Sequence, residues 1–180
     1  MIQALQSIHQ LSEQLKLKPL VIEDAQALFA EISESRAQLA KYLYWVDGVT
    51  DVVSTECYID ERINSGLPSA TWFTIINGER VCGVFGIKYI DGDKHLAEVG
   101  YWLGTNAQGR GVISQIITYI KAFLKQHQVR DLVIACLAQN NVSIRVAEKA
   151  GGKLVSVEPK AMVIDGQAQA LLTYQISLSA

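Results

Sequence analysis

The sequence has little proline, no excess of charge of either sign and no segment of low complexity. Among 180 residues there are 3 prolines and 13 glycines, well below the share found in disordered or fibrous chains. Lys and Arg number 16 against 18 Asp and Glu, so the net charge is −2. A protein held to nucleic acid mainly through phosphates needs a basic excess, so we expect no nucleic-acid partner. The hydrophobic share of 49% is large enough for a folded core.

Signals for disulfides, metals and membranes are also missing. Cys57, Cys82 and Cys136 lie far apart and form no Cys-x-x-Cys pair. The sequence therefore predicts three reduced thiols, and neither a disulfide framework nor a metal site. Residues 1–20 lack the pattern of a signal peptide, and the chain has no apolar run of the length that spans a membrane. These absences predict a cytoplasmic protein with no membrane partner.

The first third of the chain is predicted to be mainly helical. The length predicts one domain over residues 1–180, since domains have about 150 residues. Residues 1–11 fit either an extra strand or a loose arm, and residues 15–20 alternate apolar and basic side chains as a strand does. Three helical patterns follow, beginning at Asp24, at the candidate cap Ser35 and at Val52, the last running to Asn64.

The middle of the chain predicts an antiparallel meander. Three runs rich in β-branched and aromatic residues cover 71–76, 81–90 and 96–103. Asn77-Gly78 separates the first two runs, and Asp91-Gly92 follows the second. These dipeptides between strand patterns are strong signals for tight hairpins.

The last third predicts a parallel crossover. Apolar residues recur at helical spacing from Gly111 to Leu124, and a continuous apolar run over 132–137 is typical of a strand buried on both faces. A strand, a helix and a strand in this order imply a right-handed parallel connection. A short helix over 143–150 and two strands, about 153–157 and 171–178, complete the chain. The fold class is therefore α+β, with a mixed sheet of six or seven strands, mostly antiparallel with one parallel step, and about four or five helices.

One segment carries an anion-binding signal. The strand that ends at Leu103 leads into Gln108-Gly109-Arg110-Gly111-Val112, where the next helix begins. The first N–H groups of a helix have no internal partner, the helix dipole is positive there, and glycines let a phosphate approach the backbone. Arg110 adds a cation. The spacing matches neither a P-loop nor a dinucleotide-binding turn, so these glycines alone also fit a simple tight turn.

A second segment, Asn140 to Gly151, opens the helix after the next strand. Both segments follow the carboxyl ends of strands joined by a parallel crossover, where ligands of such sheets bind. Together they resemble the GNAT superfamily of acetyl-CoA-dependent N-acetyltransferases, whose phosphate motif is Gln/Arg-x-x-Gly-x-Gly/Ala. Residues 108–113 match it except that Ile113 replaces a small residue, and the later Asn-x-x-Ser…Glu-Lys-x-Gly pattern is present. The run Gly100 to Leu103 makes the chain most similar to the RimL/RimJ ribosomal-protein acetyltransferases.

The resemblance implies a site and a reaction. It implies that the enzyme moves an acetyl group from acetyl-CoA to a primary amine, most readily the N-terminal α-amine of a ribosomal protein. The pantetheine arm would lie between the strands that end at Leu103 and Leu137, and Ser143 would supply a proton to the thiolate. The residues implied to hold the cofactor are Leu103, Gln108, Gly109, Arg110, Gly111, Val112, Ile113, Ser114 and Asn140. The resemblance also implies that the protein can form a homodimer.

Glu98 is the candidate base, because the predicted sheet places it near the gap between those strands. The stretch before the final strand, where RimL-like enzymes carry a carboxylate, has none here, and only Glu158 and Asp165 flank it. Two alternatives therefore stay open. One is acetyl transfer to a small amine such as a polyamine, an amino acid or an aminoglycoside. The other is an acyl-CoA-binding module without turnover.

Overall fold

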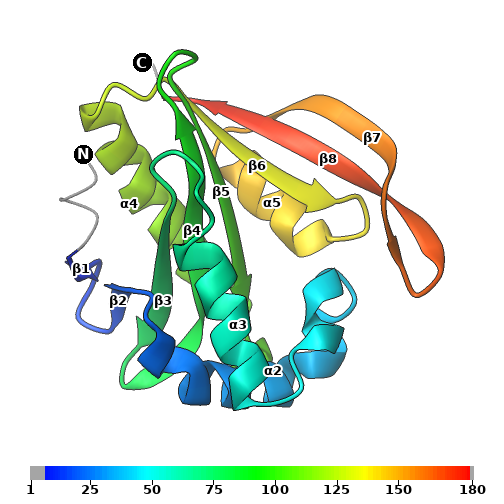
Figure 1. The fold of residues 1–180 in the computed structure, drawn as a ribbon. Coiled ribbons are helices and arrows are strands. Elements are labelled where there is room, and N and C mark those ends of the chain that lie inside the picture. Colours follow the sequence, from blue (N-terminus) through cyan, green and yellow to red (C-terminus); the bar gives the residue numbers. More distant parts are fainter. Residues whose placement is uncertain (1–6, 179–180) are drawn as a thin grey trace.

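The computed structural model describes residues 7–178, and within them eight strands form one mixed sheet (Figure 1). The strand order is β1-β2-β3-β4-β5-β6-β8-β7. All neighbours are antiparallel except β5 and β6. The predicted α+β class with a single parallel step is confirmed. The strands are β1 His9–Gln10, β2 Leu15–Pro19, β3 Thr71–Asn77, β4 Arg80–Asp91, β5 Leu96–Leu103, β6 Asp131–Leu137, β7 Lys153–Ile164 and β8 Gln167–Ser177.

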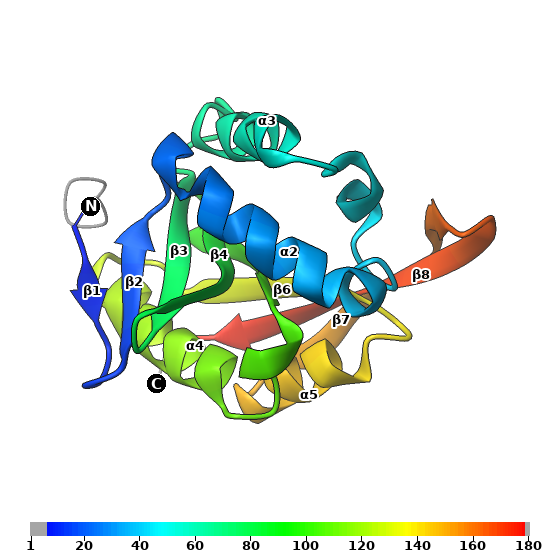
Figure 2. The same ribbon diagram turned by 90° about the horizontal axis from the view of Figure 1, so that it is seen from below.

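Four α-helices in the described part of the chain cover the two faces of the sheet. Helices α2 (Ala25–Leu39) and α3 (Val52–Ile63) lie on one face, and α4 (Val112–Gln126) and α5 (Asn141–Lys149) lie on the other (Figure 2). Each pair has its own apolar core against the sheet, one containing Trp102 and the other α4. The sheet is thus enclosed by helices over its central strands, and β5 contacts both cores.

The sheet and the N-terminal helices differ from the sequence prediction in three places. The sheet has eight strands because β1 adds an edge strand within 1–11; residues 1–6 lie outside the described residues. Strands β7 and β8 are longer than predicted because they pair as a hairpin that projects beyond the helices (Figure 1). The prediction that Ser35 caps a second helix was wrong. Ser35 is buried inside α2, where its hydroxyl accepts a hydrogen bond from the Thr105 N–H at 2.8 Å.

The sheet opens on the carboxyl side of its parallel step. Strands β5 and β6 pair from Leu96 with Asp131 to Val99 with Ile134, and no further pairs follow. Beyond this point β6 continues to Leu137 with β8 as its one paired strand, while β5 continues to Leu103 paired with β4. The two strands therefore diverge by their carboxyl ends, as Figure 1 shows.

Helix α4 fixes one wall of this opening. Its apolar side chains Ile116, Ile117, Ile120 and Leu124 are at most 1% exposed. Burial of each such side chain contributes about 1.5–3 kcal/mol, so the helix is held firmly against the sheet. The N-terminus of α4 consequently has a fixed position beside the end of β5.

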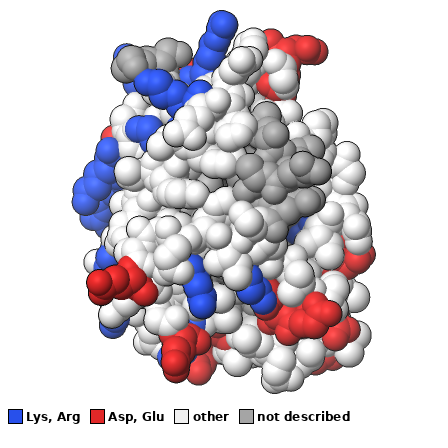
Figure 3. All heavy atoms as spheres, turned by 90° about the vertical axis from the view of Figure 1, so that its left-hand side faces the viewer, with Lys and Arg blue, Asp and Glu red and all other residues white. Residues whose placement is uncertain are grey.

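The outer surface mixes charges of both signs. On the face seen in Figure 3, Lys and Arg side chains lie near Asp and Glu side chains at the margin of a largely uncharged surface. Among the described residues, no helix is long and apolar enough to cross a membrane. The three cysteines form no disulfide; Cys82 and Cys136 are buried and Cys57 is exposed.

Candidate functional site

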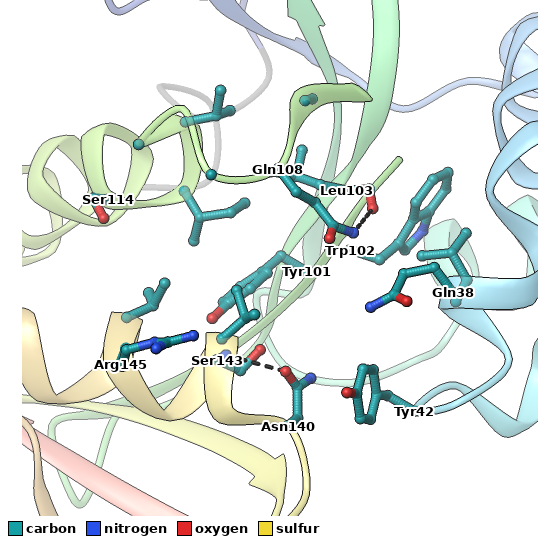
Figure 4. Close-up of a pocket in the computed structure, with 18 of the residues that line it drawn as sticks. Gln38, Tyr42, Tyr101, Trp102, Leu103, Gln108, Ser114, Asn140, Ser143 and Arg145 are labelled. Atoms are coloured by element: carbon teal, nitrogen blue, oxygen red, sulfur yellow. Dashed lines mark hydrogen bonds between the residues drawn. The ribbon is translucent and has the colours of Figure 1, made fainter. Parts of the chain in front are cut away.

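A cavity of about 680 Å³ lies where β5 and β6 diverge. Its walls come from the end of β5, the turn into α4, the first turns of α4 and α5, and the end of α2 with the turn that follows it (Figure 4). In Figure 4, Gln38 and Tyr42 lie on one side of the cavity and Ser143 and Arg145 on another. The cavity thus joins both helical layers of the protein through the opening in the sheet.

The turn into α4 offers backbone N–H groups to this cavity. Gly109 and Gly111 have φ values of +73° and +74°, and a Cβ built on either would meet no atom within 4 Å. Gly111 is the N-cap of α4, and no side chain caps that helix. The first N–H groups of α4 are therefore open on the side that faces the cavity, where the helix dipole is positive. This arrangement can hold an anion such as a diphosphate.

Helix α5 begins differently, at the opposite wall. The Asn140 side chain accepts a hydrogen bond from the Ser143 N–H at 3.1 Å, so this helix start is capped by its own residue. The cap orients Ser143, which lines the cavity and is half-buried. Of the two helix starts at the cavity, α4 is therefore the one free to bind an anion.

A side chain also anchors the end of β5. The Gln108 Nε2 atom donates a hydrogen bond to the Leu103 carbonyl oxygen at 2.9 Å (Figure 4). The turn between β5 and α4 is thereby tied back to the strand, and both residues line the cavity. The bond holds the two walls at a fixed separation.

The structure brings most of the predicted site residues together at this cavity. The predicted residues that line it are Leu103, Gln108, Gly109, Gly111, Val112, Ile113, Ser114, Asn140 and Ser143. Val112 and Ile113 are buried, so their backbone is the part available to a ligand. Arg110 is exposed and is not among the lining residues.

Glu98 lies elsewhere, contrary to the expectation that it would face the gap. It pairs with Val133, before the strands diverge, and its carboxylate forms an ion pair with Lys88 of β4. Glu98 is four residues before Trp102 on the same strand, a separation of about 13 Å. Glu98 does not line the cavity. Glu158 and Asp165, the flanking carboxylates near the last turn, are exposed and do not line it either.

Among the cavity residues that the sequence prediction gave no catalytic or cofactor-binding role are Tyr101, Arg145 and Lys149. Tyr101 projects from the separated part of β5, and Arg145 and Lys149 lie one turn apart on α5. We found no ion pair between Arg145 or Lys149 and an acidic side chain in residues 7–178. The four-residue spacing of Arg145 and Lys149 indicates that they share one face of the helix. Whether that face lines the cavity depends on how α5 packs, which the spacing does not show.

The cavity is cationic in character. Arg145 and Lys149 are its charged lining residues, and within the described part of the chain no Asp or Glu lines it. An anionic ligand is thus favoured at the wall formed by α4 and α5. No lining side chain has the carboxylate that would bind a cationic acceptor or act directly as a base.

Comparison with known proteins agrees with this geometry. The chain is 28% identical over 142 residues to the ribosomal-protein-serine acetyltransferase of Escherichia coli (strain K12), which covers 78% of this chain and 79% of that protein. The solved structure of the ribosomal-protein α-N-acetyltransferase RimL in complex with coenzyme A superposes with a TM-score of 0.85 at 24% identity, over 94% of this chain and 97% of that one. The microcin self-immunity acetyltransferase MccE in complex with acetyl-CoA and AMP gives 0.84 at 23% identity, over 95% and 96%.

A family model for the acetyltransferase (GNAT) domain matches residues 14–153, which contain the meander, the open helix start and the capped one. Structural neighbours of the chain hold coenzyme A or acetyl-CoA. The cavity, the uncapped glycine turn and the divergence of β5 from β6 fit that co-substrate. The chain therefore belongs to the GNAT acetyltransferase family and is an acetyl-CoA-dependent acetyltransferase.

Proposed function

We propose that this enzyme transfers the acetyl group of acetyl-CoA to the free α-amine at the N-terminus of a protein, with a ribosomal protein as the acceptor. The observation that carries the proposal is the lack of any Asp or Glu among the described residues that line the cavity. A polyamine carries several positive charges and needs acidic side chains to bind. An N-terminal α-amine needs none, and the names of the relatives given above support the ribosomal acceptor.

Chemistry favours the same acceptor, because the attacking amine must be neutral. An α-amine has a pKa of about 8, so about a tenth of it is neutral near pH 7. A lysine amine, with a pKa of about 10.4, is neutral to less than about a thousandth. A site without a side-chain base therefore serves an α-amine far better than a lysine or a polyamine.

The co-substrate is assigned to the cavity as follows. The diphosphate lies on the backbone N–H groups of Gly109 to Ser114, with the Arg110 side chain at the rim. The pantetheine arm occupies the opening between β5 and β6, beside Leu103 and Asn140. This placement is supported by the open Cβ positions at both glycines and by the end of pairing after Val99.

Transfer is direct, in a ternary complex. The amine nitrogen attacks the thioester carbonyl, a C–N bond forms, and the C–S bond breaks with its electron pair left on sulfur. The amine loses its proton to water. The Ser143 hydroxyl donates a hydrogen bond to the departing thiolate, and a backbone N–H near Leu103 stabilises the oxyanion. The reaction is assigned to the cytoplasm, where acetyl-CoA and new protein N-termini occur together.

The acceptor class can be tested with a matched panel of amines. We expect a peptide with a free N-terminal serine to be acetylated about 100-fold faster at pH 7 than the same peptide with a blocked N-terminus and one lysine, in the ratio of the neutral amine fractions. The preference should shrink as the pH rises toward 10, because the lysine amine then loses its proton. Release of the coenzyme A thiol measures the rate, and mass spectrometry locates the acetyl group.

Other outcomes of the panel point to the alternatives. Faster turnover with spermidine, an amino acid or an aminoglycoside would replace the peptide acceptor by a small amine. Tight acetyl-CoA binding with no thiol release beyond the hydrolysis background, for any amine, would indicate a binding module.

The cations on α5 are expected to strengthen binding of the phosphates of acetyl-CoA. Arg145 and Lys149 line the same cavity as the glycine turn. Replacing both by glutamine (Arg145→Gln with Lys149→Gln) should weaken acetyl-CoA binding about tenfold, which is about 1.4 kcal/mol. The loss should be larger at low salt than at high salt, since exposed charges are screened. Calorimetry at two salt concentrations measures both effects.

The matched control removes two positive charges far from the cavity. Lys94 and Arg130 are exposed and do not line it. The variant Lys94→Gln with Arg130→Gln has the same net charge as the test variant. An equal loss of affinity in both variants would contradict a local role for Arg145 and Lys149.

A further inference from the structure

The Tyr101 hydroxyl is a buried polar group that lacks a well-formed hydrogen bond. Its oxygen has no partner of good geometry within residues 7–178, although the Ser143 hydroxyl lies near it, and the residue lines the cavity. Leaving such a hydroxyl unpaired destabilises the folded protein, because its hydrogen bonds to water are lost and not replaced. Most buried side-chain polar atoms are paired, so an exception inside a binding cavity points to a hydrogen bond that forms when the site is occupied.

The position of the Tyr101 hydroxyl is fixed by the strand that carries the residue and by the packing of its ring. Tyr101 lies on β5 after Val99, where β6 no longer pairs with the strand. Its ring is stacked on Phe85 of β4, with centroids 6.5 Å apart and an angle of 5° between the planes. In Figure 4 the ring points from β5 toward the side where Ser143 and Arg145 lie. The hydroxyl is therefore aimed across the cavity at the start of α5.

The environment keeps this hydroxyl protonated. Burial raises the pKa of Tyr101 to about 12, and the nearby Ser143 hydroxyl opposes that rise in part. At neutral pH the group is thus a hydrogen-bond donor that does not lose its proton. A phenol is a better donor than an alcohol, so in a Tyr–Ser pair the tyrosine donates and the serine oxygen accepts. The serine hydrogen is then left for a second acceptor.

We propose that Tyr101 is a positioning residue of the transfer site, whose hydroxyl donates a hydrogen bond to the Ser143 oxygen so that the Ser143 hydrogen points at the sulfur of coenzyme A. This rests on the proposed role of Ser143 at the thiolate. Tyr101 keeps its proton throughout, and no bond to it forms or breaks. Its effect on the sulfur passes through Ser143 alone.

The test compares coenzyme A with desulfo-coenzyme A, which lacks the sulfur atom, and needs no amine acceptor. In the wild type the thiolate gains a hydrogen bond, so the affinity ratio of coenzyme A to desulfo-coenzyme A should rise as the pH passes through the thiol pKa. In Tyr101→Phe we expect this rise to be about three- to tenfold smaller. In Ser143→Ala the rise should be lost, and adding Tyr101→Phe to that variant should change nothing further.

The phenylalanine variant keeps the ring and its packing on Phe85, so the fold is expected to persist. Tyr119→Phe is the matched control, because Tyr119 lies on α4 outside the cavity, where its hydroxyl is hydrogen-bonded to His9. That control should behave as the wild type. Turnover gives a second readout: Tyr101→Phe should lower kcat while the KM for acetyl-CoA changes little.

Two results would overturn the inference. One is a wild-type pH response in Tyr101→Phe; the other is an equal effect of Tyr101→Phe with and without Ser143, which would show that tyrosine acts on its own. A wrong acceptor assignment would leave the coenzyme A titrations unchanged, whereas absence of the pH-dependent ratio in the wild type would remove the Ser143 role together with that of Tyr101. The two failures are therefore distinguishable.

Discussion

Replacing Gly111 by aspartate is expected to weaken acetyl-CoA binding by at least about 100-fold, which is about 2.7 kcal/mol. Gly111 is the N-cap of α4 with a φ of +74°, and the space beside its Cα is open to the cavity. The new carboxylate would occupy the place of the diphosphate and repel it, and it would also accept hydrogen bonds from the N–H groups of α4 that the phosphates need. Aspartate tolerates a positive φ better than most residues, so the fold should survive.

The matched control for this variant is Gly78→Asp. Gly78 has a φ of +65° and likewise nothing within 4 Å of its Cβ position, but it lies in the hairpin between β3 and β4. Both variants add the same charge at the same backbone conformation. Calorimetry with acetyl-CoA should show wild-type affinity for Gly78→Asp and none measurable for Gly111→Asp. Equal affinity in the two variants would mean that the diphosphate does not rest on this turn.

The meander and the open helix start could be predicted from the sequence because local chemistry determines them. Asn77-Gly78 and Asp91-Gly92 favour tight turns between strands, whatever the rest of the chain does. The apolar side chains of α4 recur on one face, and the glycines at 109 and 111 precede it directly. Each of these features is determined by residues close together in the sequence, and each is present in the structure.

The side chains that meet across the cavity could be predicted only in part, because their contacts are set by packing. Glu98 and Tyr101 are three residues apart on β5, so they point to opposite faces of the sheet. The cavity is lined from both faces, by Tyr101 and by Trp102, but only along the part of β5 beyond Val99, and the sequence did not show where the pairing of β5 with β6 ends. Ser35 likewise has the residue type of a cap, yet its hydroxyl is paired with a backbone N–H 70 residues away.

The strand lengths at the far edge were underestimated for a related reason. Most of β7 is exposed, including Leu154, Val155 and Val157. An edge strand with apolar residues on exposed positions lacks the alternation that identifies a half-buried strand. The pairing with β8, and not the pattern of β7 itself, determines how far this strand extends.

Replacing Gly83 by alanine is expected to destabilise the protein by about 3 kcal/mol, near the upper end of the range for overpacked positions. Gly83 of β4 pairs with Leu103 of β5, at the point where β5 leads into the cavity. A Cβ at this position would overlap the Trp102 carbonyl oxygen and lie 3.1 Å from the Leu103 Cα. These are backbone atoms, so no side-chain rotation relieves the clash and the two strands must separate.

Separating β4 from β5 in Gly83→Ala should also disturb the acetyl-CoA cavity, so the same variant should lose both stability and binding. The Leu103 carbonyl is held by Gln108, and the Gly104 N–H donates to the Cys82 carbonyl at 2.9 Å. Moving β5 therefore displaces the turn that leads to Gly111, and acetyl-CoA affinity should fall together with the urea midpoint of unfolding.

Gly92→Ala is the control, because Gly92 lies in a turn with nothing within 4 Å of its Cβ position. It should change the free energy of unfolding by less than about 1 kcal/mol. If the two variants unfolded alike and bound acetyl-CoA alike, the close approach of β4 to β5 would not be what fixes the wall of the cavity.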